Sequence, residues 1–314
     1  MRGRTTIIVT AATAALTGGV TLGTLVVDPA AGPGRPVAGS SSAGPVRELT
    51  DAERVRVEQA EQRLIERCMR ARGFRYWVLP PLDPERLRAF EHPFVRDDVS
   101  WAREHGYGAP IQRAFFAAKK RDPNIAYRNG LSGPARARYL TALNGGPDAE
   151  VLSVRLPAGG SIRLAIGGCE RAAREKLYGD AETYFRADKI ATNLNPLYVP
   201  KVVRDQRFTE ALAAWSHCMR RTTGRAYADP DAVRADLPKR TKGLNRAEAD
   251  AVEVRLAVAE ATCARKSSLG GTARTLDREY GDPVRERYAE HLRTSGRMRL
   301  AALAEAERTS TPSN

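Results

Sequence analysis

Four widely spaced cysteines constrain the fold of this chain more than any other feature. They are Cys68, Cys169, Cys218 and Cys263. Four cysteines allow three disulfide pairings, and the spacing alone does not select one of them. No C-x-x-C is present and each cysteine lies on the apolar face of a predicted helix, so neither a redox pair nor a zinc site is indicated. We therefore expect a mainly α-helical body held by structural disulfides.

The start of the chain has the pattern of an export signal. Arg2 and Arg4 precede an uncharged apolar stretch, residues 5–27. Basic residues ahead of such a stretch stay in the cytoplasm, so the rest of the chain is predicted to be secreted or otherwise extracytoplasmic. Two fates of residues 1–27 stay open, a cleaved signal peptide and an uncleaved membrane anchor. Export agrees with the cysteines, because disulfides persist in oxidising compartments.

The remaining chain divides by composition and periodicity. Residues 28–48 are rich in Pro, Gly and Ser and predict a disordered linker. A capping box at Thr50 and Glu53 opens the first helix, residues 51–72. Alternating residues around a Pro-Ala-Gly-Gly turn predict a β-hairpin at about 150–166. We predict a helical module with this hairpin at 49–200, a helical module at 201–308 and a disordered tail at 309–314.

Helix boundaries in the second half are marked by caps. Residues 204–223 and 245–268 have the apolar spacing of amphipathic helices. Asp180 and Asp282 are each expected to cap the helix that follows. Pro283, directly after Asp282, suits the first turn of a helix, so the last helix is predicted to begin there.

A short repeat suggests how the cysteines pair. CMRARGFRY at residues 68–76 resembles CMRRTTGRAY at residues 218–227. In each, a helix ends after Cys-Met, a glycine stops it and a tyrosine follows. Each repeat precedes one more helix with a single cysteine, which favours Cys68–Cys169 and Cys218–Cys263 and two duplicated, disulfide-stapled helical modules.

The net charge of +14 bears on possible partners. A strongly basic protein is attracted to anionic surfaces, so an anionic cell-wall polymer, a membrane surface or an envelope protein are the partners we consider; nucleic acid is not expected. Acidic residues are interleaved with the arginines, however, as in residues 53–68. An ordinary solvated surface is therefore the competing interpretation.

No motif in the sequence predicts catalysis. The signatures G-x-S-x-G, H-E-x-x-H, G-x-x-x-x-G-K-[ST] and G-x-G-x-x-G are absent, and we assign no catalytic, cofactor-binding or metal-binding residue and no cofactor. Phe74, Tyr76 and Trp77 form an apolar stretch beside two prolines. They could line a ligand groove, although packing in the core is the more common role of such residues.

Several segments resemble a family of actinobacterial (Streptomyces-like) secreted and lipoprotein-type proteins of uncharacterised activity. The resemblance rests on the Cys-Met…Gly…Tyr segment, on the hairpin leading to Gly168-Cys169-Glu170 and on Leu177-Tyr178-Gly179-Asp180. It covers roughly residues 50–290 and implies an envelope location and a helical body with two disulfides. This chain lacks the lipobox cysteine of the anchored members, and the family brings no catalytic residue to transfer.

Three functions follow as hypotheses. The first is a non-catalytic interaction or binding protein of the extracellular space or cell envelope. The second is an envelope hydrolase with an atypical active site, and the third is a peptide- or small-ligand-binding protein. The sequence favours the first, so an enzyme is not the leading expectation.

Overall fold

The computed structural model describes residues 46–91 and 93–310. The predicted export segment, most of the predicted linker and four of the six residues of the predicted tail lie outside these residues; the first two residues of the predicted tail, 309 and 310, are helical. Within the described part of the chain, no helix has both the length and the apolar character needed to cross a bilayer.

The described chain is mainly α-helical with one β-hairpin, as predicted. The strands β1 (Glu150–Arg155) and β2 (Ser161–Ile166) pair antiparallel, with Val151 opposite Ala165. Leu152 and Val154 point to the buried face, where they pack with Phe185. The alternation of side chains in the sequence therefore placed the hairpin correctly.

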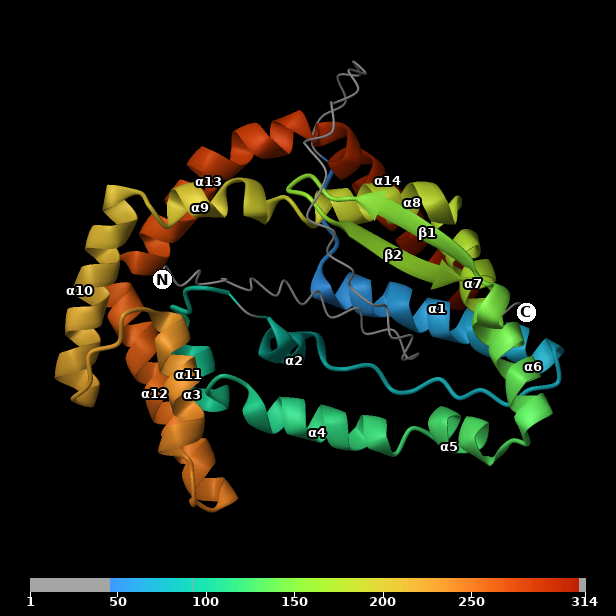
Figure 1. Cartoon of the computed structure of the whole chain (residues 1–314), viewed down its shortest axis with the longest axis horizontal. Coiled ribbons are helices and arrows are strands. Elements are labelled where there is room, and N and C mark those ends of the chain that lie inside the picture. The colour runs from blue at the N-terminus through green and yellow to red at the C-terminus, as the bar shows by residue number, and fades with distance from the viewer. Residues whose placement is uncertain (1–45, 92, 311–314) are drawn as a thin grey trace, which may run out of the picture.

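The helices form two lobes that lie side by side (Figure 1). The first lobe contains the hairpin and α1 (Asp51–Ala71), α5 (Pro123–Gly130), α6 (Gly133–Asn144), α7 (Gly168–Tyr178), α8 (Ala181–Ala191) and α14 (Ala289–Ser310). The second lobe contains α3 (Val99–His105), α9 (Val199–Val202), α10 (Gln206–Thr223), α11 (Pro230–Arg240), α12 (Arg246–Lys266) and α13 (Leu269–Arg287). Two helices, α2 (Pro84–Leu87) and α4 (Ala109–Lys120), lie between the lobes.

Each lobe has its own apolar core. In the second lobe, Trp215, Phe208 and Leu276 are fully buried among residues from α3 and α9–α13. In the first lobe, smaller cores join α1 to α6 and α7, α1 and α7 to α14, and the hairpin to α8. Each lobe thus draws on helices from both sides of residue 200, because α3 packs on α12 and α14 packs on α8, α1 and α7.

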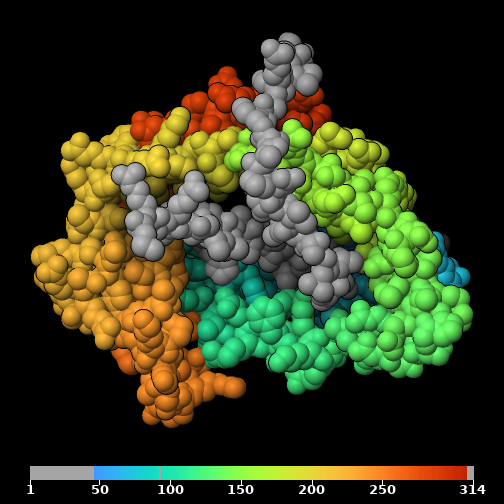
Figure 2. Space-filling model, viewed as in Figure 1, coloured from blue at the N-terminus to red at the C-terminus, as the bar shows by residue number. Residues whose placement is uncertain are grey.

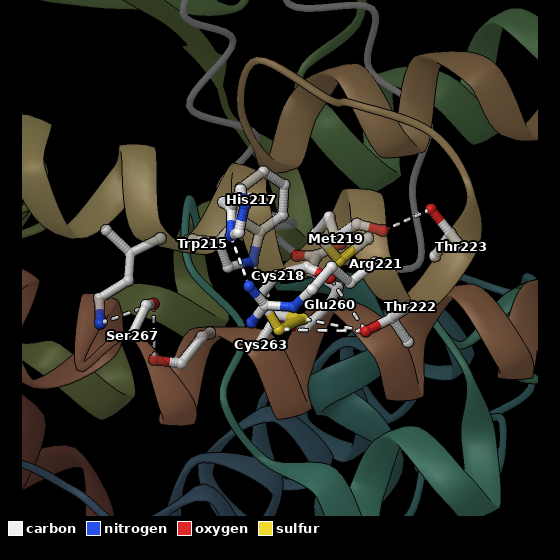
Figure 3. Close-up of a disulfide and its surroundings, with 12 residues drawn as sticks. Trp215, His217, Cys218, Met219, Arg221, Thr222, Thr223, Glu260, Cys263 and Ser267 are labelled. Atoms are coloured by element: carbon white, nitrogen blue, oxygen red, sulfur yellow. Dashed lines mark hydrogen bonds between the residues drawn. A yellow bond between two sulfur atoms is a disulfide. The ribbon is translucent and has the colours of Figure 1, made fainter.

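Each lobe contains one disulfide, and the pairing favoured by the repeat is the one observed. Cys68–Cys169 joins α1 to α7, and Cys218–Cys263 joins α10 to α12; the Cα atoms are 5.6 Å apart in both. Figure 3 shows the second disulfide between its two helices, beside Trp215 and Glu260.

The two copies of the repeat share their local structure. The methionines that follow the cysteines, Met69 and Met219, are both fully buried. Gly73 and Gly224 both have a positive φ, 80° and 74°, the left-handed conformation in which glycine ends helices. The tyrosines that follow are buried as well.

The caps explain where most helices begin, and one prediction from them is wrong. Thr50 and Glu53 form the predicted capping box at the start of α1, and Asp180 caps α8 by accepting the Thr183 N–H. Asp282 and Pro283, in contrast, lie inside α13, which continues to Arg287. Asp282 pairs with Arg285 one turn later, so its carboxylate is used within the helix and does not cap a new one.

Candidate interaction surface

The helix α4 is the least enclosed element of its length in the described chain. None of its residues is buried. Its inner side contacts the second lobe and the short turn at residues 88–90, where Phe115 packs edge-on against Phe90. Its outer side exposes Ala114, Phe116, Ala117 and Ala118. A helix whose apolar residues face solvent is the expected form of a surface that contacts another molecule.

The N-terminus of α4 is fixed by a buried carboxylate of another helix. Glu253 of α12 accepts the N–H groups of Tyr107 at 2.9 Å and Ala109 at 3.1 Å. Ala109 is the first residue of α4, so Glu253 satisfies a helix N–H that has no partner within the helix. Glycine is needed at both positions of this turn: a Cβ at Gly106 would lie 2.9 Å from Oε1 of Glu253, and one at Gly108 would lie 2.5 Å from the Cβ of Ala89.

A second buried carboxylate secures the same turn. The hydroxyl of Tyr107 donates to Glu260 at 2.7 Å, and Arg234 forms an ion pair with Glu260 at 3.2 Å. Glu260 is fully buried, and this burial raises its pKa to about 7, although Arg234 and the Tyr107 hydroxyl oppose the rise. Burial likewise raises the pKa of Glu253, while the hydrogen bonds from the Ala109 and Tyr107 N–H groups act to lower it. These contacts fix the start of α4 on the second lobe.

Charge is concentrated on α4 and the two helices that follow it. Residues 106–147 contain seven basic residues and one acidic residue, a net charge of +6. The acidic residue, Asp122, is buried and caps α5 through the Asn124 N–H. Lys120 and Arg121, at the end of α4, are exposed.

A second basic segment lies in the turn between α11 and α12. Residues 239–246 contain four basic residues and no acidic residue, and Leu244 at the centre of the turn is 40% exposed. Lys239, Lys242 and Arg246 are exposed around it. Together with residues 106–147, this turn carries +10 of the net charge of +14.

The two basic segments are neighbours. Arg113 of α4 pairs at 2.7 Å with Asp250 of α12, which lies four residues after the second segment, so the two segments are close in space. Figure 1 shows α4, α5 and the α11–α12 turn along one edge of the molecule, and Figure 2 shows the turn projecting at that edge. We call this surface the cationic edge; it comprises Phe116, Lys120, Arg121, Arg128, Lys239, Lys242, Leu244 and Arg246.

A polar pocket of about 610 Å³ lies elsewhere, at the start of α13. Its carboxylates are already held by arginines: Asp97 pairs with Arg274 and Asp98 with Arg88, both at 2.7 Å. Asp97 also lies against Gly270, at the N-terminus of α13. Asp98 also accepts the Ser100 hydroxyl, and this hydrogen bond and the Arg88 ion pair lower the pKa of its carboxyl. Both carboxylates of the pocket are thus held by neighbouring side chains.

Three carboxylates approach one another where α1 meets α7. Burial, with a smaller contribution from neighbouring Glu61, raises the pKa of Glu58 to about 7, and Lys119 of α4 opposes the rise. Glu61 is bound to Arg174 at 3.1 Å. Burial also raises the pKa of Glu170. The sequence analysis did not single out any of these residues.

The predicted aromatic segment packs against the first lobe. Tyr76 is buried and its hydroxyl donates to Gln62 at 2.8 Å. Phe74 and Trp77 are partly buried and meet Tyr139 and Tyr127 edge-on. The four cysteines lie in the disulfides already described.

The residues of the cationic edge were missed because the charge was considered over the whole chain. Basic and acidic residues do alternate along α1, but they do not alternate over residues 106–147 or 239–246. A charge count in short windows finds both segments in the sequence. Their proximity is not visible there, because it depends on the contact between α4 and α12.

No family model, curated protein or solved structure matches this chain. The disulfides indicate an oxidising, extracytoplasmic environment.

Proposed function

We propose that this protein is a non-catalytic interaction protein of the extracytoplasmic space, which binds an anionic surface of the cell envelope through the cationic edge. The observation that carries the proposal is the concentration of charge: two adjoining segments hold +10 of the net +14. Attraction of this kind raises both the rate and the strength of binding to a polyanion, and it weakens with salt.

Several features support this location and role. The basic start and the apolar stretch at residues 5–27 suit export, with either cleavage or retention of the segment as an anchor. The resemblance to secreted actinobacterial proteins would place the chain in the envelope. The carboxylates of the polar pocket are engaged in ion pairs, which suits a binding protein better than an acid–base catalyst.

The proposal is tested with soluble poly(glycerol phosphate), a polyanion with the chemistry of wall polymers. The edge variant combines Lys120→Gln, Arg121→Gln, Lys242→Gln and Arg246→Gln. Wild-type protein should bind at low salt and lose affinity as salt rises, and the edge variant should bind much more weakly.

The matched control removes the same charge from exposed arginines of the hairpin and of α13, namely Arg155, Arg163, Arg278 and Arg287. It should bind nearly as well as the wild type. Equal losses in the two variants would show that only net charge matters and would refute a role for the cationic edge.

One observation favours a second function, that of an envelope hydrolase. Burial raises the pKa of Glu58 to about 7, and a carboxyl that keeps its proton near neutral pH suits a proton donor; Glu61 lies beside it on the same helix. Release of soluble fragments from purified cell wall tests it: activity that is abolished by Glu58→Gln and retained in Glu66→Gln would support an enzyme. Equal release by both variants would count against it.

A further inference from the structure

We infer that the anionic surface is a phospholipid bilayer, and that Phe116 and Leu244 enter the boundary between its headgroups and acyl chains. This inference rests on the proposed function and names its partner. It follows from the apolar residues of the cationic edge, because a hydrophilic polymer would not bury them whereas a bilayer would.

Each basic segment carries a large apolar side chain that faces solvent. Phe116 is 55% exposed, more than any other large apolar residue in the described chain, and Leu244 is 40% exposed. Isolated exposed apolar residues are ordinary on protein surfaces. Here Phe116 lies one helical turn before the exposed Lys120, and Leu244 lies two residues from the exposed Lys242 and Arg246. Apolar residues among cations are typical of helices and turns that bind at the membrane interface.

The helical spacing on α4 places these groups on one side. Residues three and four positions apart are neighbours on a helix, so Phe116 lies between Arg113 and Lys120. Ala117 adjoins Phe116 and is also exposed. Most side chains on the exposed side of α4 are therefore short alanines, and the ring of Phe116 and the cations beside it project beyond them.

The two apolar residues can reach one surface together. Phe116 is three residues from Arg113, and Leu244 lies six residues before Asp250, the partner of Arg113. Figure 1 places α4 and the α11–α12 turn on the same edge of the molecule. A flat anionic bilayer can contact both at once, with Lys120 and Arg121 on one side and Lys242 on the other.

The helix α4 is already formed before it meets a membrane. Its first turn is bound by Glu253, and the preceding tyrosine by Glu260. A helix that is fixed in this way loses little conformational entropy on docking, in contrast to a peptide that must fold at the interface. Docking should therefore leave the helical content unchanged.

Charge complementarity selects the lipid. A basic residue near an anionic bilayer contributes to binding by a factor of about five, and partial burial of a phenylalanine contributes a similar factor. Lys120→Gln combined with Arg121→Gln should thus weaken binding about 25-fold, and Phe116→Ser about fivefold. Without anionic lipid, the apolar residues alone should give little binding.

The experiment measures co-sedimentation of the full chain with vesicles of phosphatidylcholine, with and without phosphatidylglycerol. The variants are Phe116→Ser, Leu244→Ser and the Lys120→Gln, Arg121→Gln pair. Val151→Ser is the apolar control, because Val151 is 50% exposed on β1, away from the edge. Arg278→Gln with Arg287→Gln is the charge control. Circular dichroism and the thermal midpoint establish that each variant is folded.

The outcomes separate this inference from the proposed function. Binding only to phosphatidylglycerol vesicles, weakened by Phe116→Ser and not by Val151→Ser, supports both. Edge-dependent binding to poly(glycerol phosphate) without binding to vesicles, or vesicle binding that Phe116→Ser and Leu244→Ser leave unchanged, overturns the bilayer inference and leaves the function standing. Binding to neither overturns both.

Discussion

The buried carboxyl of Glu260 should make the stability of this protein depend on pH in a way that one substitution removes. Its pKa in the folded protein is about 7, against 4.5 for an ordinary glutamate. A difference of this size corresponds to about 3 kcal/mol between the two protonation states. Glu260 is fully buried, so solvent does not screen this effect.

The direction follows from the raised pKa. The folded protein holds the proton of Glu260 more tightly than the unfolded chain does, so the stabilisation is fully present below pH 4.5. It declines as the pH rises and is lost above the folded pKa of about 7. Between pH 5 and pH 8 the loss amounts to about 2 to 3 kcal/mol.

The perturbation is Glu260→Gln, which keeps the side-chain shape but cannot ionise. The free energy of unfolding, measured with guanidinium chloride and circular dichroism at several pH values, should fall less steeply with pH in the variant. The variant loses the ion pair with Arg234 and should be less stable at every pH. The quantity to compare is therefore how the difference in unfolding free energy between wild type and variant changes with pH.

A control variant, Glu286→Gln, removes an exposed carboxylate from α13. Its pH profile should run parallel to that of the wild type. If the profile of Glu260→Gln is also parallel to the wild type, then Glu260 ionises normally and the account of the turn before α4 is wrong.

Three further predictions concern the Cys68–Cys169 disulfide, the turn before α4 and the cationic edge. Replacing Cys68 and Cys169 together by alanine opens a disulfide across 101 residues and should lower the free energy of unfolding by about 4 kcal/mol; an unchanged unfolding curve would refute its structural role. Gly108→Ala should cost about 3 kcal/mol because its Cβ would overlap Ala89, whereas Gly73→Ala, with nothing within 4 Å, should cost about 1 kcal/mol from its positive φ alone; equal losses would contradict this packing. Raising the salt concentration should weaken binding to anionic vesicles while leaving the thermal midpoint nearly constant, and salt-independent binding would exclude the electrostatic mechanism.

Local features of this chain were predictable because each depends on neighbouring residues. The capping box at Thr50, the cap at Asp180 and the alternation in the hairpin are short-range patterns, and the structure contains all of them. The repeated Cys-Met…Gly…Tyr segment also led to the observed disulfides, because the same local ending places each cysteine beside the next cysteine-bearing helix.

The features that were not predicted depend on contacts between distant segments. Asp282 and Pro283 have the sequence of a helix start, but α13 runs through them and ends at Arg287. The sequence analysis did not single out Glu253 and Glu260, and charged residues usually face solvent. They are buried because the turn before α4 and Arg234 of α11 supply their partners, and those segments lie far from α12 in the sequence.

The candidate surface was predictable only in part. The local excess of basic residues can be counted in the sequence, and so can the phenylalanine and leucine among them. That Phe116 stays exposed while Phe115 packs on Phe90 cannot be read from the spacing, because an amphipathic pattern normally predicts burial of the apolar side chains.

Lysine labelling of the unmodified protein tests the central claim most directly. Three exposed lysines, Lys120, Lys239 and Lys242, belong to the cationic edge, and the exposed lysines Lys176, Lys201 and Lys266 lie outside it. Acetylation rates measured by mass spectrometry, with and without anionic vesicles or poly(glycerol phosphate), report which of them the partner covers. The account predicts slower labelling of the three edge lysines alone; equal protection at all six, or protection confined to the other three, would contradict it.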